Sequence, residues 1–274
     1  MKFGNLVRSA FAACVLVTAA AHATPLYFFG NGPTANGSFP QGCPTSVTNC
    51  APIAQKGLFN GDVLVTATET FEGSTAGFIG ANTLPVLSGG TLGQAAPPAG
   101  YLGGAIKSGA GVSGRFNTTN GASAGNWFES DHAFTIQLTS AVGAFGFYGT
   151  DFNDFAGMLE IELLSNGNRV YENVFTNAGG GQLPLRTNST NAQDGSLVFF
   201  GFASDLLFDR IVFKVRQDPN VGVGDQDYLG FDDIMVGNLR TTTPPNPAPE
   251  PGSLALVGLA LFAAGWARKT QRPA

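Results

Sequence analysis

The sequence predicts an all-β fold, an antiparallel jelly-roll β-sandwich, on three observations. Charged residues make up only 12% of the 274 residues, whereas the chain has 38 Gly, 23 Phe and 16 Pro, a composition unlike that of helical bundles or coiled coils. Runs of β-branched and aromatic residues recur from residue 62 onward, with turn signals between them. None of these runs keeps a helical period over the roughly 10 to 12 residues that a buried helix needs.

We expect about nine strands in one domain, residues 61–240, because no linker interrupts the pattern there. The apolar and acidic alternation of residues 159–163, followed by the turn Ser165-Asn-Gly-Asn168, predicts a hairpin with one solvent-exposed face. The runs 141–148 and 197–202 are apolar on both faces, as in the central strands of a sandwich. The expected strands are Asp62–Phe71, Val112–Thr118, Trp127–Leu138, Ala141–Tyr148, Met158–Leu164, Arg169–Phe175, Ser196–Phe202, Arg210–Arg216 and Tyr228–Val236.

Residues 1–23 have the features of a secretory signal peptide. Lys2 and Arg8 precede an apolar run, which ends in the small-x-small tripeptide Ala21-His22-Ala23 that a signal peptidase accepts. The run is too short, and its basic flank too typical of a signal, to favour a buried or amphipathic helix. We therefore expect export and a mature chain that begins at Thr24.

Residues 24–60 are dense in Gly, Pro, Asn and Thr, and we expect them to form an irregular arm. Cleavage of the signal leaves Cys43 and Cys50 in a compartment where disulfides persist, so we expect the two to form a disulfide. A metal site is the alternative. Two thiols without nearby His cannot complete a tetrahedral zinc shell.

The C-terminus combines a stalk with a short apolar segment. Residues 241–251 contain five prolines, which keep the backbone extended. Residues 252–267 carry no charge, and Arg268, Lys269 and Arg272 follow them. As a helix the apolar segment would be about 24 Å long, short for a permanent membrane span but adequate for a transient one. The basic cluster would mark its cytoplasmic side.

Residues 249–272 resemble the PEP-CTERM sorting signal of Gram-negative bacteria. The resemblance rests on the tripeptide Pro249, Glu250 and Pro251, on the short apolar segment, and on the terminal basic patch. It implies that an exosortase recognises the tripeptide and processes the tail, after transient contact of the C-terminal helix with the membrane. The protein would then reach the cell surface or the extracellular matrix, often beside exopolysaccharide.

The charge distribution excludes nucleic acid as a first interpretation. Residues 24–251 hold 9 basic and 19 acidic side chains, a net charge of −10, and such a body repels phosphate backbones.

Catalytic residues are scarce in the mature chain. His132 is its one histidine, and no Gly-x-Ser-x-Gly nucleophile elbow accompanies it, so we interpret it as a surface residue at a strand entry. Glu160 and Glu162 lie on one face of a strand, with Glu172 in the neighbouring strand, and paired carboxylates can hydrolyse glycosides. No Trp or Tyr interleaves with them to stack a sugar ring, which favours a solvated surface. Phosphate-binding loops, zinc signatures and dinucleotide fingerprints are absent from the sequence.

Acidic loops suggest a structural Ca²⁺ ion. Asp151-Phe-Asn-Asp154, the acidic loop 218–227 and Asp232-Asp233 offer hard oxygen ligands at close spacing, with solubility as the alternative explanation. Thr70-Phe-Glu72-Gly73 together with residues 230–234 is similar to the pattern in MAM and lectin/glucanase-like jelly-roll modules. That resemblance implies adjacent first and last strands with Glu72 and Asp232 as cation ligands; Asp151 is added on expected proximity. The chain lacks the cysteines that accompany the MAM pattern.

Two functions follow from these observations. The first is a secreted, non-enzymatic surface or matrix protein, sorted by an exosortase, that either binds exopolysaccharide or builds the matrix. The alternative is a secreted glycoside-active jelly-roll enzyme that uses Glu160 and Glu162.

Overall fold

The fold is described from a computed structural model of the chain. The chain divides into two compact units, residues 1–239 and 240–274, and the elements below all belong to the first. The structure describes residues 25–33, 51–80, 83–97, 99–112, 114–119, 124–152, 157–176, 183–184, 196–217 and 228–240.

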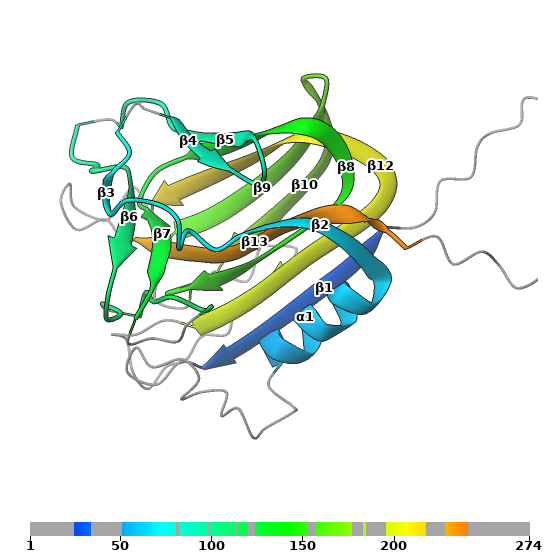
Figure 1. Cartoon of the computed structure of the whole chain (residues 1–274), viewed down its shortest axis with the longest axis horizontal. Coiled ribbons are helices and arrows are strands. Elements are labelled where there is room, and N and C mark those ends of the chain that lie inside the picture. The colour runs from blue at the N-terminus through cyan, green and yellow to red at the C-terminus, as the bar shows by residue number, and fades with distance from the viewer. Residues whose placement is uncertain are drawn as a thin grey trace, which may run out of the picture. The chain divides into compact units, whose positions relative to one another are not determined.

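The all-β prediction is confirmed: strands dominate the described residues and form one mostly antiparallel, hydrogen-bonded sheet, with a single described helix, α1 (Ala51–Asp62) (Figure 1). The strands are β1 (Leu26–Pro33), β2 (Val63–Glu69), β3 (Gly77–Phe78), β4 (Thr83–Val86), β5 (Gly90–Gly93), β6 (Gly104–Ser108), β7 (Asn126–Ser130), β8 (Phe134–Thr150), β9 (Gly157–Ser165), β10 (Asn168–Thr176), β11 (Leu183–Pro184), β12 (Ser196–Gln217) and β13 (Leu229–Leu239).

Two long strands, β8 and β12, give the sheet its sandwich form. The first part of β12, residues 196–203, pairs with β1 and with the end of β8, whereas its second part, residues 210–217, pairs with β9. The register between β8 and β12 is broken between Ala203 and Arg210. Phe147 and Phe213 lie at opposite ends of this ribbon, yet their ring centroids are 5.6 Å apart, because the two halves face each other.

Phenylalanine fills the main core between the two halves. Phe134 and Phe213 stack at 4.3 Å, and Phe231 of β13 meets both rings edge-on at 5.0 and 5.3 Å. Such contacts add roughly 0.5 to 1.5 kcal/mol each beyond the area that the rings bury. The high Phe count of the sequence is therefore explained by this core.

A second core lies between α1 and the outer face of the sheet, and it corrects the prediction for residues 24–60. That segment is not wholly irregular, because β1 and α1 occupy part of it. Phe28 of β1 and Phe59 of α1 pack edge-on against each other at 5.4 Å, and Phe59 meets Phe199 of β12 edge-on at 5.8 Å. Tertiary burial of these rings outweighs the turn preference of the neighbouring Gly and Asn residues. It also explains why the runs 141–148 and 197–202 are apolar on both faces.

Several strand boundaries differ from expectation. The hairpin β9–β10 is confirmed, with Asn166 and Gly167 both at positive φ, as a two-residue turn requires. Residues 112–118 do not form the expected strand, since only Val112 and Arg115 make an isolated bridge. The expected strand Trp127–Leu138 is interrupted at residues 131–133, and β8 continues from there without a break to Thr150.

The described residues include no helix long and apolar enough to span a membrane. The predicted signal peptide (1–23), stalk and sorting segment (241–274), the cysteines at 43 and 50, and the acidic loop 218–227 lie outside the described residues.

Candidate functional site

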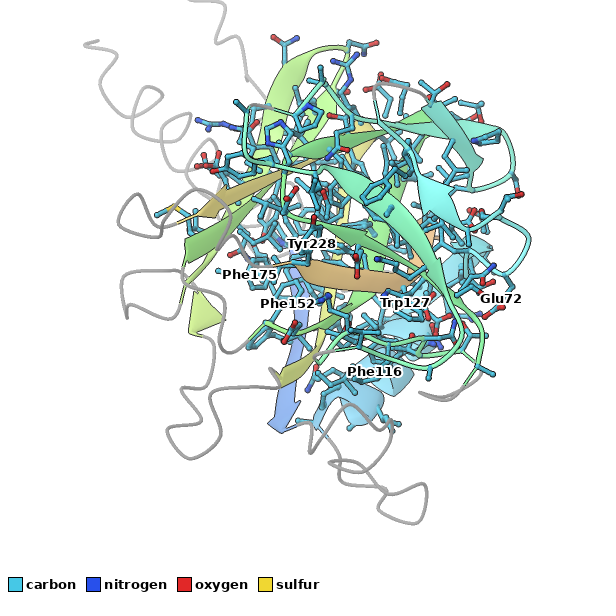
Figure 2. All side chains as sticks on the ribbon, turned by 90° about the vertical axis from the view of Figure 1, so that its left-hand side faces the viewer. Glu72, Phe116, Trp127, Phe152, Phe175 and Tyr228 are labelled. Carbon is cyan, nitrogen blue, oxygen red and sulfur yellow. The ribbon has the colours of Figure 1, made fainter. Side chains whose placement is uncertain are left out.

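Residues 115–119, which begin at the isolated bridge, make a dense set of polar contacts at one end of the body, the end that faces the viewer in Figure 2. We call residues 115–119 the clasp. Four of its five residues hold carboxylates of β7, of β13, of the end of β8 and of the turn after β2, while Phe116 between them is fully buried in the second core. The backbone N–H groups of Thr118 and Thr119 donate to Asp232 instead of to a neighbouring strand, which competes with the strand expected there.

Arg115 holds two buried carboxylates. Its Nε donates to Glu129 Oε2 at 3.1 Å and its Nη1 to Asp151 Oδ2 at 2.7 Å. The guanidinium also lies over the ring of Tyr228, 5.4 Å from its centroid. Burial opposes the charge of Arg115, but the two ion pairs outweigh it and raise the pKa of the guanidinium. This ion-pair group joins β7, the end of β8 and the start of β13.

Asn117 holds Glu72, the first predicted metal ligand. Asn117 Nδ2 donates to Glu72 Oε1 at 2.7 Å and to the backbone oxygen of Asn126 at 2.6 Å. The backbone N–H of Asn126 lies 3.3 Å from both carboxylate oxygens of Glu72. Glu72 therefore fastens the turn after β2 to the start of β7.

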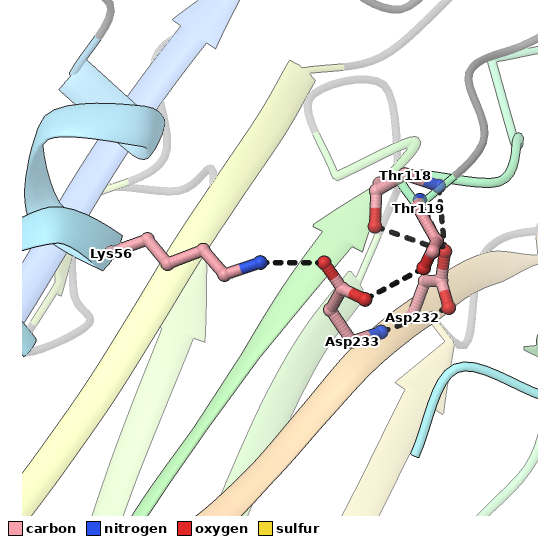
Figure 3. A network of polar contacts seen from close by, with 5 residues as sticks. All are labelled: Lys56, Thr118, Thr119, Asp232 and Asp233. Carbon is pink, nitrogen blue, oxygen red and sulfur yellow. Dashed lines mark hydrogen bonds and ion pairs between the residues drawn. The ribbon is translucent and has the colours of Figure 1, made fainter. Parts of the chain in front are cut away.

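Thr118 holds Asp232, the second predicted ligand, which is fully buried in β13 (Figure 3). The N–H and the hydroxyl of Thr118 donate to Asp232 Oδ2 at 2.6 and 2.9 Å, and the N–H of Asp233 donates to Oδ1 at 2.8 Å. Burial, together with the negative charge of Asp233, raises the pKa of Asp232 to about 7 in spite of these donors.

Asp233 ties the clasp to α1. Its Oδ1 accepts the hydroxyl hydrogen of Thr119 at 2.7 Å, and its Oδ2 pairs with Lys56 Nζ at 2.6 Å. Lys56 in turn lies over the ring of Tyr148 at 4.8 Å. Asp233 has a φ of 47°, a left-handed conformation that Asp tolerates better than most residues, and the register of β13 against β8 is broken at this point.

The three predicted Ca²⁺ ligands do not come together as a metal site. The predicted neighbourhood of Glu72 and Asp232 is present, because β2 pairs with β13 and neighbouring clasp residues hold the two acids. Their oxygens, however, accept hydrogen bonds from N–H and O–H groups, and Asp151 faces a guanidinium. Such donors compete with a cation for the same lone pairs. No group of three or more His, Cys, Asp or Glu in the described part of the chain is arranged to hold a metal ion.

The donor set therefore does not fit a shared Ca²⁺ ion, and Ca²⁺ binding stays a prediction without support from the geometry. Sequence reasoning missed Arg115, Asn117 and the two threonines as partners of these acids. The run of polar residues from 117 to 119, at the end of an expected strand, was the available signal.

Glu160 and Glu162, the carboxylates of the enzymatic alternative, share one lysine. Lys214 Nζ lies 2.7 Å from Glu160 Oε1 and 2.8 Å from Glu162 Oε1, and Arg169 bridges Glu162 and Glu172. The hydrogen bond from Lys214 lowers the pKa of Glu162. A general acid in glycoside hydrolysis needs a raised pKa, so this arrangement favours an ion-paired surface.

His132 is half-buried and has no nucleophile aligned with it. The hydroxyl of the nearby Ser130 donates to the backbone oxygen of His132 at 2.7 Å instead of to the ring. Asp131 accepts the N–H groups of Leu102 and Gly103 at 2.9 and 2.8 Å. Burial lowers the pKa of His132. These contacts shape a turn and do not assemble a Ser-His-Asp triad.

Comparison with known proteins finds one family and ten matching chains of solved structures, two of which illustrate the likeness. The family described as the PEP-CTERM protein-sorting motif matches residues 247–269, which confirms the sorting signal around Pro249, Glu250 and Pro251. No curated protein matches the chain.

Both solved structures are cleaved adhesin domains of Lys-gingipain. The first is 16% identical with a TM-score of 0.37 and covers 62% of this chain and 97% of that domain. The second, from Porphyromonas gingivalis, is 14% identical with a TM-score of 0.29 and covers 64% of this chain and 99% of that domain. Both scores are too low for a functional comparison, and neither tests the likeness to MAM or lectin modules.

Proposed function

We propose that this chain is a non-enzymatic surface protein of a Gram-negative bacterium, which an exosortase sorts and which binds extracellular polysaccharide. The observation that carries the proposal is the PEP-CTERM motif at residues 247–269, since such a motif implies processing by an exosortase and export to the cell envelope or surface. The predicted signal peptide at residues 1–23 supplies the matching entry into the secretory route.

The body supports a binding role over a catalytic one. The acids Glu72, Asp151 and Asp232 are each held by a donor of the clasp, so they join elements of the fold. Glu160 and Glu162, which a glycosidase would need in different protonation states, are both paired with Lys214. The net charge of −10 over residues 24–251 favours uncharged polymers over acidic ones.

Recognition of the tripeptide tests the sorting function. Glu250→Ala should leave the apolar segment intact but block processing, so that the mutant keeps its tail and stays in the membrane fraction. Asn246→Ala, a change in the same stalk but outside the matched motif, should be processed like the wild type. The measurement is cell fractionation with mass spectrometry of the C-terminus. Normal processing of Glu250→Ala would show that an exosortase does not use this motif.

A further inference from the structure

A groove of about 200 Å³ opens at the edge of the sandwich where β2, the turn after β4 and the middle of β8 meet. Its floor is aliphatic and belongs to the main core, and its rim carries hydroxyl groups from three separate segments. The floor comprises Leu87, Leu138, Val142 and Val236, and the rim carries Thr66, Ser88, Thr139 and Ser140.

A β-bulge places Thr66 at this groove. The register of β13 against β2 passes from Val236 opposite Ala67 directly to Gly237 opposite Val65, so Thr66 is the extra residue. Its hydroxyl lies 3.2 Å from the backbone oxygen of Val236. Bulges re-aim side chains and recur beside functional sites.

A strained turn forms the second wall. Leu87 and Ser88 have φ values of 50° and 58°, a left-handed conformation that costs energy in residues other than Gly. Glu69 stabilises the turn, since its Oε2 accepts the N–H of Leu87 at 3.2 Å while its Oε1 accepts that of Phe71 at 2.7 Å. The carboxylate of Glu69 therefore stabilises the turn, although Glu69 is not one of the residues that line the groove.

A break in the register between β8 and β12 forms the third wall. Gln137 pairs with Arg210 and Val142 with Phe208, so residues 138–141 of β8 stand opposite a single residue of β12. Leu138 stays buried in the floor, whereas Thr139 and Ser140 are exposed. Three backbone irregularities, each of which departs from regular sheet geometry, thus converge on one groove.

We infer that this groove binds one ring of an uncharged sugar, an inference that rests on the proposed binding of polysaccharide. Its lining contains no charged side chain, and its hydroxyls both donate and accept, as ring hydroxyls do. The aliphatic floor fits the apolar C–H face of a pyranose. Pockets for drug-sized ligands run from about 300 to 1,000 Å³, so a groove of about 200 Å³ suits a single ring. A polysaccharide would extend from this ring into solvent.

The test uses the purified full chain and defined probes. Isothermal titration with neutral oligosaccharides of glucose, galactose, mannose, xylose and N-acetylglucosamine, and with polygalacturonate as an acidic comparison, measures binding to the wild type. Ser140→Trp fills the groove and Thr139→Val removes one rim hydroxyl at constant volume. Thr91→Trp and Thr91→Val are the matched controls, because Thr91 is an exposed residue of the adjacent strand β5 outside the lining. Thermal melting checks that each variant is folded.

We expect the wild type to bind at least one neutral oligosaccharide. Ser140→Trp should weaken this binding at least about tenfold and Thr139→Val about threefold or more, whereas both Thr91 variants bind like the wild type. Binding that is equal in all five proteins overturns the groove and leaves the proposed function standing. Binding to none of the probes overturns both, and binding to polygalacturonate alone overturns the assignment to uncharged sugars.

Discussion

Phe59 of α1 lies directly over Gly201 of β12, so closely that a Cβ atom at Gly201 would stand 2.7 Å from Phe59 Cδ2. Gly146, the partner of Gly201 on β8, leaves similar room, with 3.3 Å between its would-be Cβ and Phe59 Cζ. A pair of glycines on neighbouring strands therefore makes the recess that seats the helix. The helix depends on the sheet for its burial, and the sheet depends on the helix to cover this recess.

Gly201→Ala should destabilise the body by about 1 to 3 kcal/mol, because the added methyl group overpacks a fully buried ring. Gly57→Ala, on the exposed side of α1 with no atom near its would-be Cβ, should stabilise by about 0.5 to 1 kcal/mol. Urea unfolding of both variants provides the comparison. Equal effects of the two substitutions would contradict the seating of Phe59 on Gly201.

The Lys56–Asp233 pair should couple α1 to β13. Lys56→Met leaves Asp233 buried without its cation, and we expect a loss of about 1 to 3 kcal/mol, less than for a fully buried pair because the lysine side chain is 26% exposed. In an Asp233→Asn background, which keeps a residue tolerant of positive φ, the same change should cost much less. A double-mutant cycle in urea measures the coupling; additive effects would show that the pair contributes nothing.

Stability should depend on pH through Asp232. Its folded pKa of about 7 lies above the ordinary value of 3.8, so the folded state binds the proton more tightly than the unfolded chain. The free energy of unfolding should therefore fall as pH rises from about 4 to about 7. The Asp232→Asn variant lacks this titrating carboxyl, so its stability profile should be flatter over the same pH range. A wild-type profile that rises through this window contradicts the assignment.

Glu162 should act in the opposite direction at lower pH. Lys214 lowers its pKa, so its contribution is present above the unfolded value near 4.5 and is lost as pH falls below it. Lys214→Met should reduce the acid-dependent loss of stability, and melting curves between about pH 2 and 5 measure it. The effect is small, because the lysine is 30% exposed.

Chelation decides the Ca²⁺ prediction. Because the oxygens of Glu72 and Asp232 already accept protein donors, EDTA should leave the melting temperature of metal-free protein and of protein supplied with Ca²⁺ unchanged. A melting temperature that drops with EDTA and recovers with Ca²⁺ would reinstate these acids as ligands.

Local pattern was sufficient for part of the fold. The alternation in β9, the turn at Asn166 and Gly167, and the course of β13 all follow from short-range sequence signals. Packing over long sequence distances was not readable in this way. Phe59 is buried because glycines of β8 and β12 make room for its ring. The residues near position 59 do not indicate that these distant glycines lie against it.

The site shows the same division. The sequence predicted that the strand before Glu72 lies beside the strand that carries Asp232, and β2 does pair with β13. It could not assign their partners, because Asn117 and Thr118 lie in a segment whose aromatic and β-branched residues favour a strand. The donors of that segment bind acids that are distant in the sequence. Which acids they bind depends on the tertiary structure.

The pairing of the first strands with the last ones bears on how such a chain leaves the cell. β1 pairs with β12 and β2 pairs with β13, so neither N-terminal strand has a partner until the final strands have been synthesised. Strand pairs between such distant parts of a sequence form slowly, so the nascent chain cannot complete its native sheet early. This order of pairing would suit export in an extended state, because the N-terminal strands cannot pair before the last strands are available.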